Sequence, residues 1–224
     1  MKSMLKNVFI FLIVILTAAF QSPVPVEKEA HHHLKFENKY VRVFDAVVDP
    51  GDETLFHLHS NDYVFVTFGN ITVKAQALDQ QPADLILKDG EVRYTKAPIT
   101  HRVINQSSAT FHALAVEILA SSGVKEEGAP LKGTPGHSIV LENDRVRVER
   151  LILEPGQSTG IHTHTLMSLG VAVTAAKVAY ESPGQSPQVA EFQPGVFNWH
   201  GEKRTHSLKN VGTTRFEAVE IEWK

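Results

Sequence analysis

The sequence predicts an all-β protein made of two tandem small barrels, and three observations support this. The chain of 224 residues repeats itself at a fixed shift. Within each half, β-branched and aromatic residues form short runs that Gly, Pro, Asn or Asp interrupt. No stretch has the periodicity of a long amphipathic helix. Many short strands with turn signals every eight to twelve residues or so, roughly the spacing seen here, are typical of a sandwich or barrel.

The repeat relates one half of the chain to the other without an insertion. Residues 36–51 read FENKYVRVFDAVVDPG and residues 141–156 read LENDRVRVERLILEPG, so Gly51 corresponds to Gly156 and the shift is 105 residues. The same shift relates further pairs: His57 and His162, His59 and His164, Gly90 and Gly195, His101 and His206, Asn105 and Asn210, Phe111 and Phe216, Glu117 and Glu222. This agreement indicates an internal duplication.

The duplication divides the chain into domains. We expect the first barrel over residues 34–120 and the second over 137–224. Residues 121–136, rich in Gly, Pro, Ser and Lys, are predicted to be a linker. Residues 31–33, three consecutive histidines, are expected to lie in a flexible, solvated N-terminal segment rather than in a metal site.

The N-terminus has the pattern of a secretory signal peptide over residues 1–20. Lys2 and Lys6 precede an apolar run over 8–20, and polar, proline-containing sequence follows. The run is shorter than the ~20 residues that a membrane span needs. We therefore expect an exported protein, periplasmic or secreted, with no membrane span after cleavage; an uncleaved anchor is the alternative.

Composition excludes several classes of function. A formal net charge of -3 and a sequence pI of about 6.5 provide no basic surface for nucleic acid. Because the chain has no cysteine, it has neither disulfides nor thiolate chemistry. The 12 histidines are therefore the main candidate metal ligands.

The histidines form two matching sets. His57 and His59 stand two apart in a predicted strand, so their side chains point to one face. His101 begins another strand and can supply a third ligand from across the barrel. Residues His162, His164 and His206 repeat the set. The alternative is that these side chains line a ligand pocket through hydrogen bonds, but three imidazoles buried together without a partner would be costly.

These spacings resemble the two signature motifs of the cupin superfamily. Gly51, five residues, His57, one residue and His59 resemble the first motif; Gly90, then His101 and Asn105, resemble the second. The second half repeats both, so the chain is similar to bicupins, which are two jelly-roll barrels with one potential metal site each. The resemblance implies that a divalent metal (Fe, Mn, Zn, Cu or Ni) binds to these histidines: His57, His59, His101, His162, His164 and His206.

The chain departs from the family at the acidic ligand. The family places a glutamate four or five residues after the second histidine, where this chain has Tyr63 and Val64. Asp62 lies one residue early and remains a candidate fourth ligand. Its counterpart is Met167, expected to be a packed apolar residue, with no carboxylate nearby. The second barrel is thus the one we expect to lack function, if either does.

Other polar residues have no triad spacing. We expect ordinary surface or supporting roles for three histidines: His112, His137 and His200. For His200 the alternative is that it lines a pocket. We interpret two charged pairs that recur at the repeat shift as structural ion pairs: Arg42 with Glu117, and Arg147 with Glu222.

The resulting functional hypothesis is a metal-dependent small-molecule enzyme of the dioxygenase or isomerase kind. Such an ion acts as a Lewis acid or, if it is iron or copper, in oxygen chemistry. The alternative is a non-catalytic module that binds or senses a small ligand or a metal, because fold alone does not decide function. Whether the chain is an enzyme, its substrate and its oligomeric state, homo-oligomers included, stay open.

Overall fold

The protein is described by a computed structural model that covers residues 22–123, 131 and 133–224, so the predicted signal peptide and part of the predicted linker lie outside it. The first half contains one short 3₁₀ helix and ten strands: β1 (Val24–Pro25), η1 (Val26–Lys28), β2 (His32–Glu37), β3 (Val41–Val48), β4 (His57–His59), β5 (Tyr63–Phe68), β6 (Ile71–Ala77), β7 (Ala83–Leu87), β8 (Val92–Thr95), β9 (Ile99–Ile104) and β10 (Phe111–Ile118). The second half contains nine strands: β11 (His137–Glu142), β12 (Val146–Leu153), β13 (His162–His164), β14 (Ser168–Ala172), β15 (Ala176–Glu181), β16 (Gln188–Phe192), β17 (Phe197–His200), β18 (Arg204–Asn210) and β19 (Phe216–Trp223).

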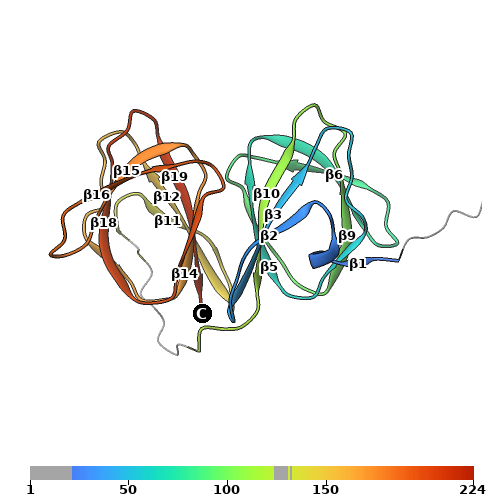
Figure 1. The fold of residues 1–224 in the computed structure, drawn as a ribbon, viewed down its shortest axis with the longest axis horizontal. Coiled ribbons are helices and arrows are strands. Elements are labelled where there is room, and N and C mark those ends of the chain that lie inside the picture. Colours follow the sequence, from blue (N-terminus) through green and yellow to red (C-terminus); the bar gives the residue numbers. More distant parts are fainter. Residues whose placement is uncertain (1–21, 124–130, 132) are drawn as a thin grey trace, which may run out of the picture.

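The strands of each half pair in a nested order. In the first half β3 pairs with β10, β4 with β9, β5 with β8 and β6 with β7. The second half repeats this with β12 and β19, β13 and β18, β14 and β17, and β15 and β16. This is jelly-roll pairing, and Figure 1 shows the two barrels side by side. The predicted fold class, an all-β chain of two tandem barrels, is confirmed.

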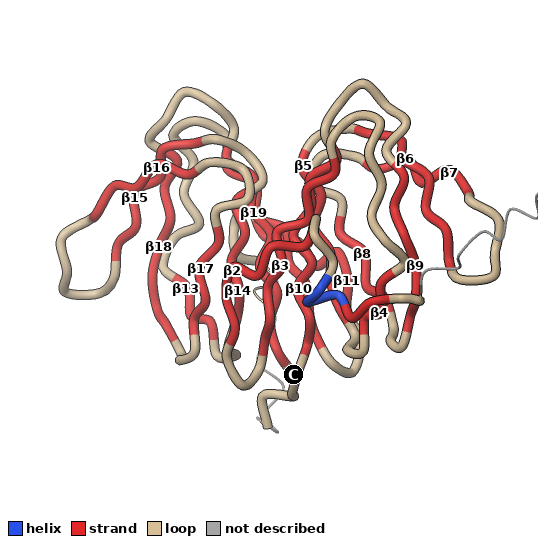
Figure 2. The backbone as a smooth tube through the Cα atoms, turned by 45° about the vertical axis from the view of Figure 1, so that its right-hand side comes forward, coloured by secondary structure: helices blue, strands red, loops and turns tan. Residues whose placement is uncertain are grey.

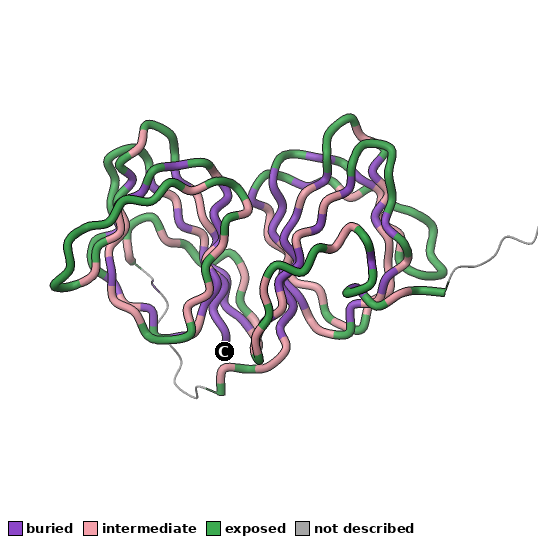
Figure 3. Tube along the Cα trace, in the orientation of Figure 1, coloured by how far each residue is buried: buried purple, intermediate pink, exposed green. Residues whose placement is uncertain are grey.

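The two barrels share a core between them. Strand alternation sends one set of side chains into each barrel and the other set toward the neighbouring barrel. The outward sets meet in one buried cluster, which includes Val41, Val43 and Val116 of the first barrel and Ile221 and Trp223 of the second. Figure 3 shows this buried layer as the purple strands at the centre of the molecule. The barrels are therefore packed as one body.

Equivalent positions of the two barrels both make polar contacts near this interface, but with different residues. Arg150 of the second barrel pairs with Glu217 and donates to the carbonyl oxygen of Gly90 in the first barrel at 2.6 Å. At the repeat shift Arg150 corresponds to Asp45 and Glu217 to His112, and Asp45 and His112 pair with each other at 2.7 Å. His112 in turn lies against Gly195, the counterpart of Gly90. The interface is thus pseudo-twofold. The basic and the acidic member of this pair occupy opposite positions in the two barrels.

The N-terminal segment differs from the prediction. His32 begins strand β2, which pairs with β3, so the expectation of a flexible segment over residues 31–33 was wrong. Strand β1 runs parallel to β4, and η1 lies beside it (Figure 2). The physical reason is the buried carboxylate of Glu29, which accepts hydrogen bonds from the His32 ring at 2.7 Å and the His31 ring at 3.0 Å. These contacts order the chain from Glu29 into β2.

Among the described residues, no helix is both long and apolar enough to cross a membrane.

Candidate metal centres

The structure brings the three predicted histidines of the first barrel together. His57 and His59 lie on β4, and His101 lies directly opposite His57 on the antiparallel strand β9. The ring centroid of His101 is 4.5 Å from that of His57 and 5.4 Å from that of His59. His101 therefore comes from the neighbouring strand of the same sheet and not, as expected, from across the barrel.

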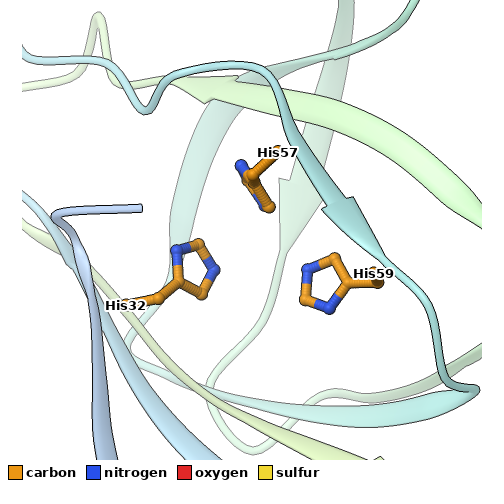
Figure 4. A group of neighbouring side chains, drawn as sticks. All are labelled: His32, His57 and His59. Atoms are coloured by element: carbon orange, nitrogen blue, oxygen red, sulfur yellow. The ribbon is translucent and has the colours of Figure 1, made fainter. Parts of the chain in front are cut away.

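The residue that does reach across the barrel is His32. It projects from β2 in the opposite sheet, and its ring centroid lies 4.5 Å from that of His57 and 5.8 Å from that of His59. One potential ligand atom from each of these three residues lies within 4.8 Å of the others. Figure 4 shows the three rings pointing toward a common space. Sequence reasoning missed His32, although a signal was present: the repeat shift carries His32 onto His137.

Each of these rings is held at one nitrogen so that the other faces the cluster. The Nδ1 atom of His57 donates to the carbonyl oxygen of Leu55 at 2.9 Å. The Nδ1 atom of His59 lies 3.4 Å from a carboxylate oxygen of Glu117, and His32 uses its Nδ1 for Glu29. Hydrogen bonds at one ring nitrogen fix the tautomer and present the other nitrogen as a ligand.

The nitrogens that face inward lack hydrogen-bond partners. Within the described ranges, the buried Nε2 atoms of His57 and His101 make no hydrogen bond. A buried polar atom left in this state costs about 1–3 kcal/mol, and a bound metal ion would remove that cost. The donor set of neutral imidazoles suits a divalent transition metal, so the residues present fit such an ion.

Burial keeps these imidazoles neutral. It lowers the pKa of His57 to about 3 and that of His101 well below its ordinary value, with further lowering by the neighbouring histidines. Burial by itself would raise the pKa of Glu29, but hydrogen bonds from His32 and His31 outweigh it and lower that pKa to about 2. His57 and His101 are therefore unprotonated near neutral pH, the form that ligates a metal.

A string of polar residues supports the cluster from behind and occurs in both barrels. Glu117, beside His59, also binds Arg42 at 3.2 Å, and Arg42 binds Glu37 at 3.1 Å. The second barrel has the same string, with every member shifted by 105 residues. His164 lies 3.5 Å from Glu222, Glu222 lies 3.3 Å from Arg147, and Arg147 lies 3.2 Å from Glu142. The predicted ion pairs are present, and their carboxylates also contact a histidine of each cluster.

The second barrel has an equivalent cluster. His162 lies opposite His206, with ring centroids 4.5 Å apart, and its Nε2 lies 3.1 Å from that of His164. One ligand atom from each of these three lies within 4.8 Å of the others. Burial lowers the pKa of His162 to about 4 and that of His206 to about 2. His137, expected to have an ordinary role, lies beside the cluster, its centroid 5.1 Å from that of His162 and 6.4 Å from that of His164.

A cavity of about 140 Å³ opens next to this second cluster. Besides five histidines, its lining contains a charged pair: Arg204 binds Glu220, and Arg204 also donates to the hydroxyl of Ser168 at 2.7 Å. Burial alone would raise the pKa of Glu220, but Arg204 and the neighbouring His164 lower it to about 2. The remaining wall is mainly apolar, with Phe192, Leu208 and Phe216 among its members. An apolar pocket with a few convergent polar groups is typical of a small-ligand site.

The first barrel lacks this polar set. Its cavity has a volume of about 60 Å³ and an apolar lining that includes Leu85, Val103 and Phe111. At the repeat shift, Arg204 and Glu220 correspond to Ile99 and Ala115. The first cluster is therefore enclosed by apolar residues, whereas the second borders a polar cavity.

The remaining candidates lie elsewhere. The carboxylate of Asp62 accepts hydrogen bonds from the Tyr94 hydroxyl and from the backbone N–H of Ala97 at 2.8 Å, which directs it away from the histidines. Asp62 and burial together raise the pKa of Tyr94 to about 12, burial being the larger cause. Met167 is half-buried and is not among the residues that line the cavity. His200 lines the cavity of the second barrel, as the pocket-lining alternative anticipated.

Solved structures with a similar fold were found by comparison. AerE from Microcystis aeruginosa is 13% identical, with a TM-score of 0.66 over 90% of this chain and 98% of that chain. Oxalate decarboxylase from Bacillus subtilis, a protein with Mn(II) centres, is 10% identical, with a TM-score of 0.55 over 83% of this chain and 69% of that chain. A cupin domain from Bordetella pertussis Tohama I is 30% identical over 39% of this chain and 91% of that chain, with a TM-score of 0.37.

No family model matches the chain, and no curated protein sequence matches it. The fold, the nested strand pairing and the histidine motifs together define the class: the chain belongs to the cupin superfamily. Within it, the chain is a bicupin whose clusters of histidines occur in both barrels.

Proposed function

We propose that this bicupin binds a divalent metal ion in each barrel and that the second barrel is the active site for a small molecule. The observation that carries the proposal is the second cluster, where three buried histidines border a cavity with the Arg204–Glu220 pair. When bound there, the metal would supply Lewis-acid or, for iron or copper, redox chemistry. The oxalate decarboxylase neighbour, with its Mn(II) centres, supports a divalent metal in this fold.

The residues around the cavity would bind and orient the substrate. Arg204 and Glu220 offer a donor and an acceptor next to His164, and the apolar wall excludes water from the remaining surface. Glu220 supplies a carboxylate in the cavity wall that the local spacing of the sequence had not revealed. We propose a dioxygenase- or isomerase-like reaction on this basis, in a protein that its N-terminal sequence predicts to be exported.

A non-catalytic role is the second candidate, and the first barrel favours it. Its cluster is enclosed and its cavity is small and apolar. If both barrels only held a metal ion and admitted no substrate, the protein would bind metal without turnover.

Metal analysis of variants that disable one barrel at a time tests the proposal. Purified protein should contain about one metal ion per intact cluster; His57→Ala with His101→Ala should remove one ion, and His162→Ala with His206→Ala the other. Only the second pair should abolish turnover in a panel of diketones, phenols, thiols and sugar acids. Protein that stays free of metal after growth in supplemented medium would refute metal binding, and turnover lost only with the first pair would refute the assignment to the second barrel.

A further inference from the structure

The strand that opens each described barrel carries a histidine that no cupin motif assigns, and the two barrels use it differently. His32 on β2 belongs with His57 and His59 to the compact ligand group of the first barrel, and the ring centroid of His101 lies 4.5 Å from that of His57. His137 on β11 is its counterpart, but the compact group of the second barrel consists of other histidines. The centroid distances agree: His32 is 4.5 Å from His57, and His137 is 5.1 Å from His162.

Both histidines are oriented by a buried carboxylate. Glu29 accepts a hydrogen bond from Nδ1 of His32 at 2.7 Å, and Glu149 lies 3.3 Å from Nδ1 of His137. The two acids do not correspond, because the repeat shift carries Glu29 onto Thr134 and Phe44 onto Glu149. Each barrel thus has its own carboxylate for the same ring nitrogen, an arrangement that holds a metal-ligating imidazole in place.

The surroundings of the two histidines differ in access. Both clusters are mostly buried, and the first lies beside a cavity of only about 60 Å³ with a mainly apolar lining. Strand β1 covers the first cluster from the N-terminal side, because Val24 pairs with His57 and the adjacent Val26 is buried. The second cluster faces the larger cavity with its polar lining.

We propose that His32 is a fourth nitrogen ligand of the first metal site and closes it to external ligands. His137 stands back from the second site, which keeps a position open for a small oxygen-donor molecule. The proposal rests on the metal binding proposed above and gives the two sites separate tasks: the first holds its ion inertly, and the second exchanges ligands.

The test uses Co(II) as the metal and azide as the external ligand, in full-length proteins that retain one site each. Variant His162→Ala/His206→Ala keeps the first site, and variant His57→Ala/His101→Ala keeps the second. We expect azide to shift the Co(II) absorption bands of the second-site protein only. Azide binding of equal strength at the first site would overturn the proposal.

Substitution of His32 tests its role as a ligand directly. In the first-site protein, His32→Ala should weaken Co(II) binding at least about tenfold and make the spectrum sensitive to azide. His32→Asn, whose side-chain amide lies near the position of Nδ1 and can still donate to Glu29, should do the same, whereas the exposed neighbour His33→Ala should change neither property. Unchanged affinity and continued insensitivity to azide in both His32 variants would refute the ligand assignment.

Counting nitrogens in the unsubstituted site gives a measurement that does not depend on the folding of a His32 variant. Pulsed electron paramagnetic resonance of Cu(II)-loaded proteins should detect four coordinated imidazoles in the first-site protein and three in the second-site protein. Three in each would overturn the inference while leaving the proposed function standing. Failure of both proteins to bind Co(II) or Cu(II) would instead refute the proposed function and, with it, this inference.

Discussion

The two barrels have the same framework and different interiors. Strand pairing, the histidines and the supporting string of Glu and Arg recur at one shift throughout. The interior positions that border the clusters do not: Ile99 and Ala115 in the first barrel correspond to Arg204 and Glu220 in the second. The first barrel therefore encloses its cluster in apolar surface, and the second builds a polar cavity.

This difference separates what the fold requires from what a site requires. The apolar alternation of the strands builds the barrels and their shared core, and it is common to both halves. A few substitutions inside an unchanged frame then decide whether a barrel admits a ligand, which agrees with the general rule that function lies in sites carried by a fold. The comparison also predicts that the polar pair can be removed without loss of the barrel.

The largest expected effect follows from breaking that pair. Arg204→Ile alone leaves the Glu220 carboxylate, whose side chain is only 15% exposed, without its partner and should lower the free energy of unfolding by ~3–5 kcal/mol, as should Glu220→Ala alone. The double variant Arg204→Ile/Glu220→Ala copies the first barrel and should lie within ~1 kcal/mol of the wild type, because a buried ion pair replaced by apolar residues is often neutral. Urea denaturation measures all three.

The same double variant should lose ligand binding while it keeps its metal. Single variants as stable as the wild type would show that the pair is not buried as described. A double variant as unstable as the singles would show that the two interiors are not interchangeable.

A smaller effect is expected at the pseudo-twofold interface. Gly90 has a φ of 67°, and a Cβ added there would lie 2.9 Å from Val173 Cγ1 and 3.1 Å from a carboxylate oxygen of Glu217. Backbone strain of ~1–2 kcal/mol and overpacking of ~1–3 kcal/mol together predict a loss of ~2–5 kcal/mol for Gly90→Ala.

Two glycines provide the controls for this prediction. At Gly195 the nearest contact of an added Cβ would be 3.3 Å from His112, so Gly195→Ala should cost less than Gly90→Ala. Gly69 also has a positive φ, with nothing within 4 Å, so Gly69→Ala should cost only the strain, ~1–2 kcal/mol. Equal losses at all three positions, measured by thermal or urea denaturation, would mean that the interface contacts do not contribute.

The sequence predicted most of the framework because the signals were periodic or repeated. Short alternating runs predict strands, and the 105-residue shift predicts two equivalent halves. The spacing of His57 and His59 predicts that they share a face, which the structure bears out. His32 was missed because residues 31–33 were read by their position next to the signal peptide, while the buried Glu29 that orders them is a tertiary feature.

The sequence did not predict which barrel would be open. The expectation that the second barrel is silent rested on Met167 and on the absence of an acid near it in sequence. Glu220 lies 56 residues from His164 along the chain and reaches it across the barrel, from β19 in one sheet to β13 in the other. Contacts made across strands so far apart are set by the barrel and are not visible in local spacing.

The smallest expected effect concerns the repeated string of charged residues and sharpens the comparison between the sites. Glu117→Gln should weaken metal binding at the first site and Glu222→Gln at the second, because Glu117 accepts a hydrogen bond from Nδ1 of His59 and the carboxylate of Glu222 lies 3.5 Å from Nδ1 of His164. Loss of such an outer carboxylate typically costs 10–100-fold in affinity, about 1.4–2.7 kcal/mol. The four-histidine first site should lie near the lower end of this range and the second site near the upper end.

Glu37→Gln and Glu142→Gln are the matched controls: they alter the exposed ends of the same strings and should leave metal affinity nearly unchanged. Metal titration of single-site proteins gives these affinities, and an equal loss in the control variants would mean that the string acts through net charge and not through the orientation of the histidine.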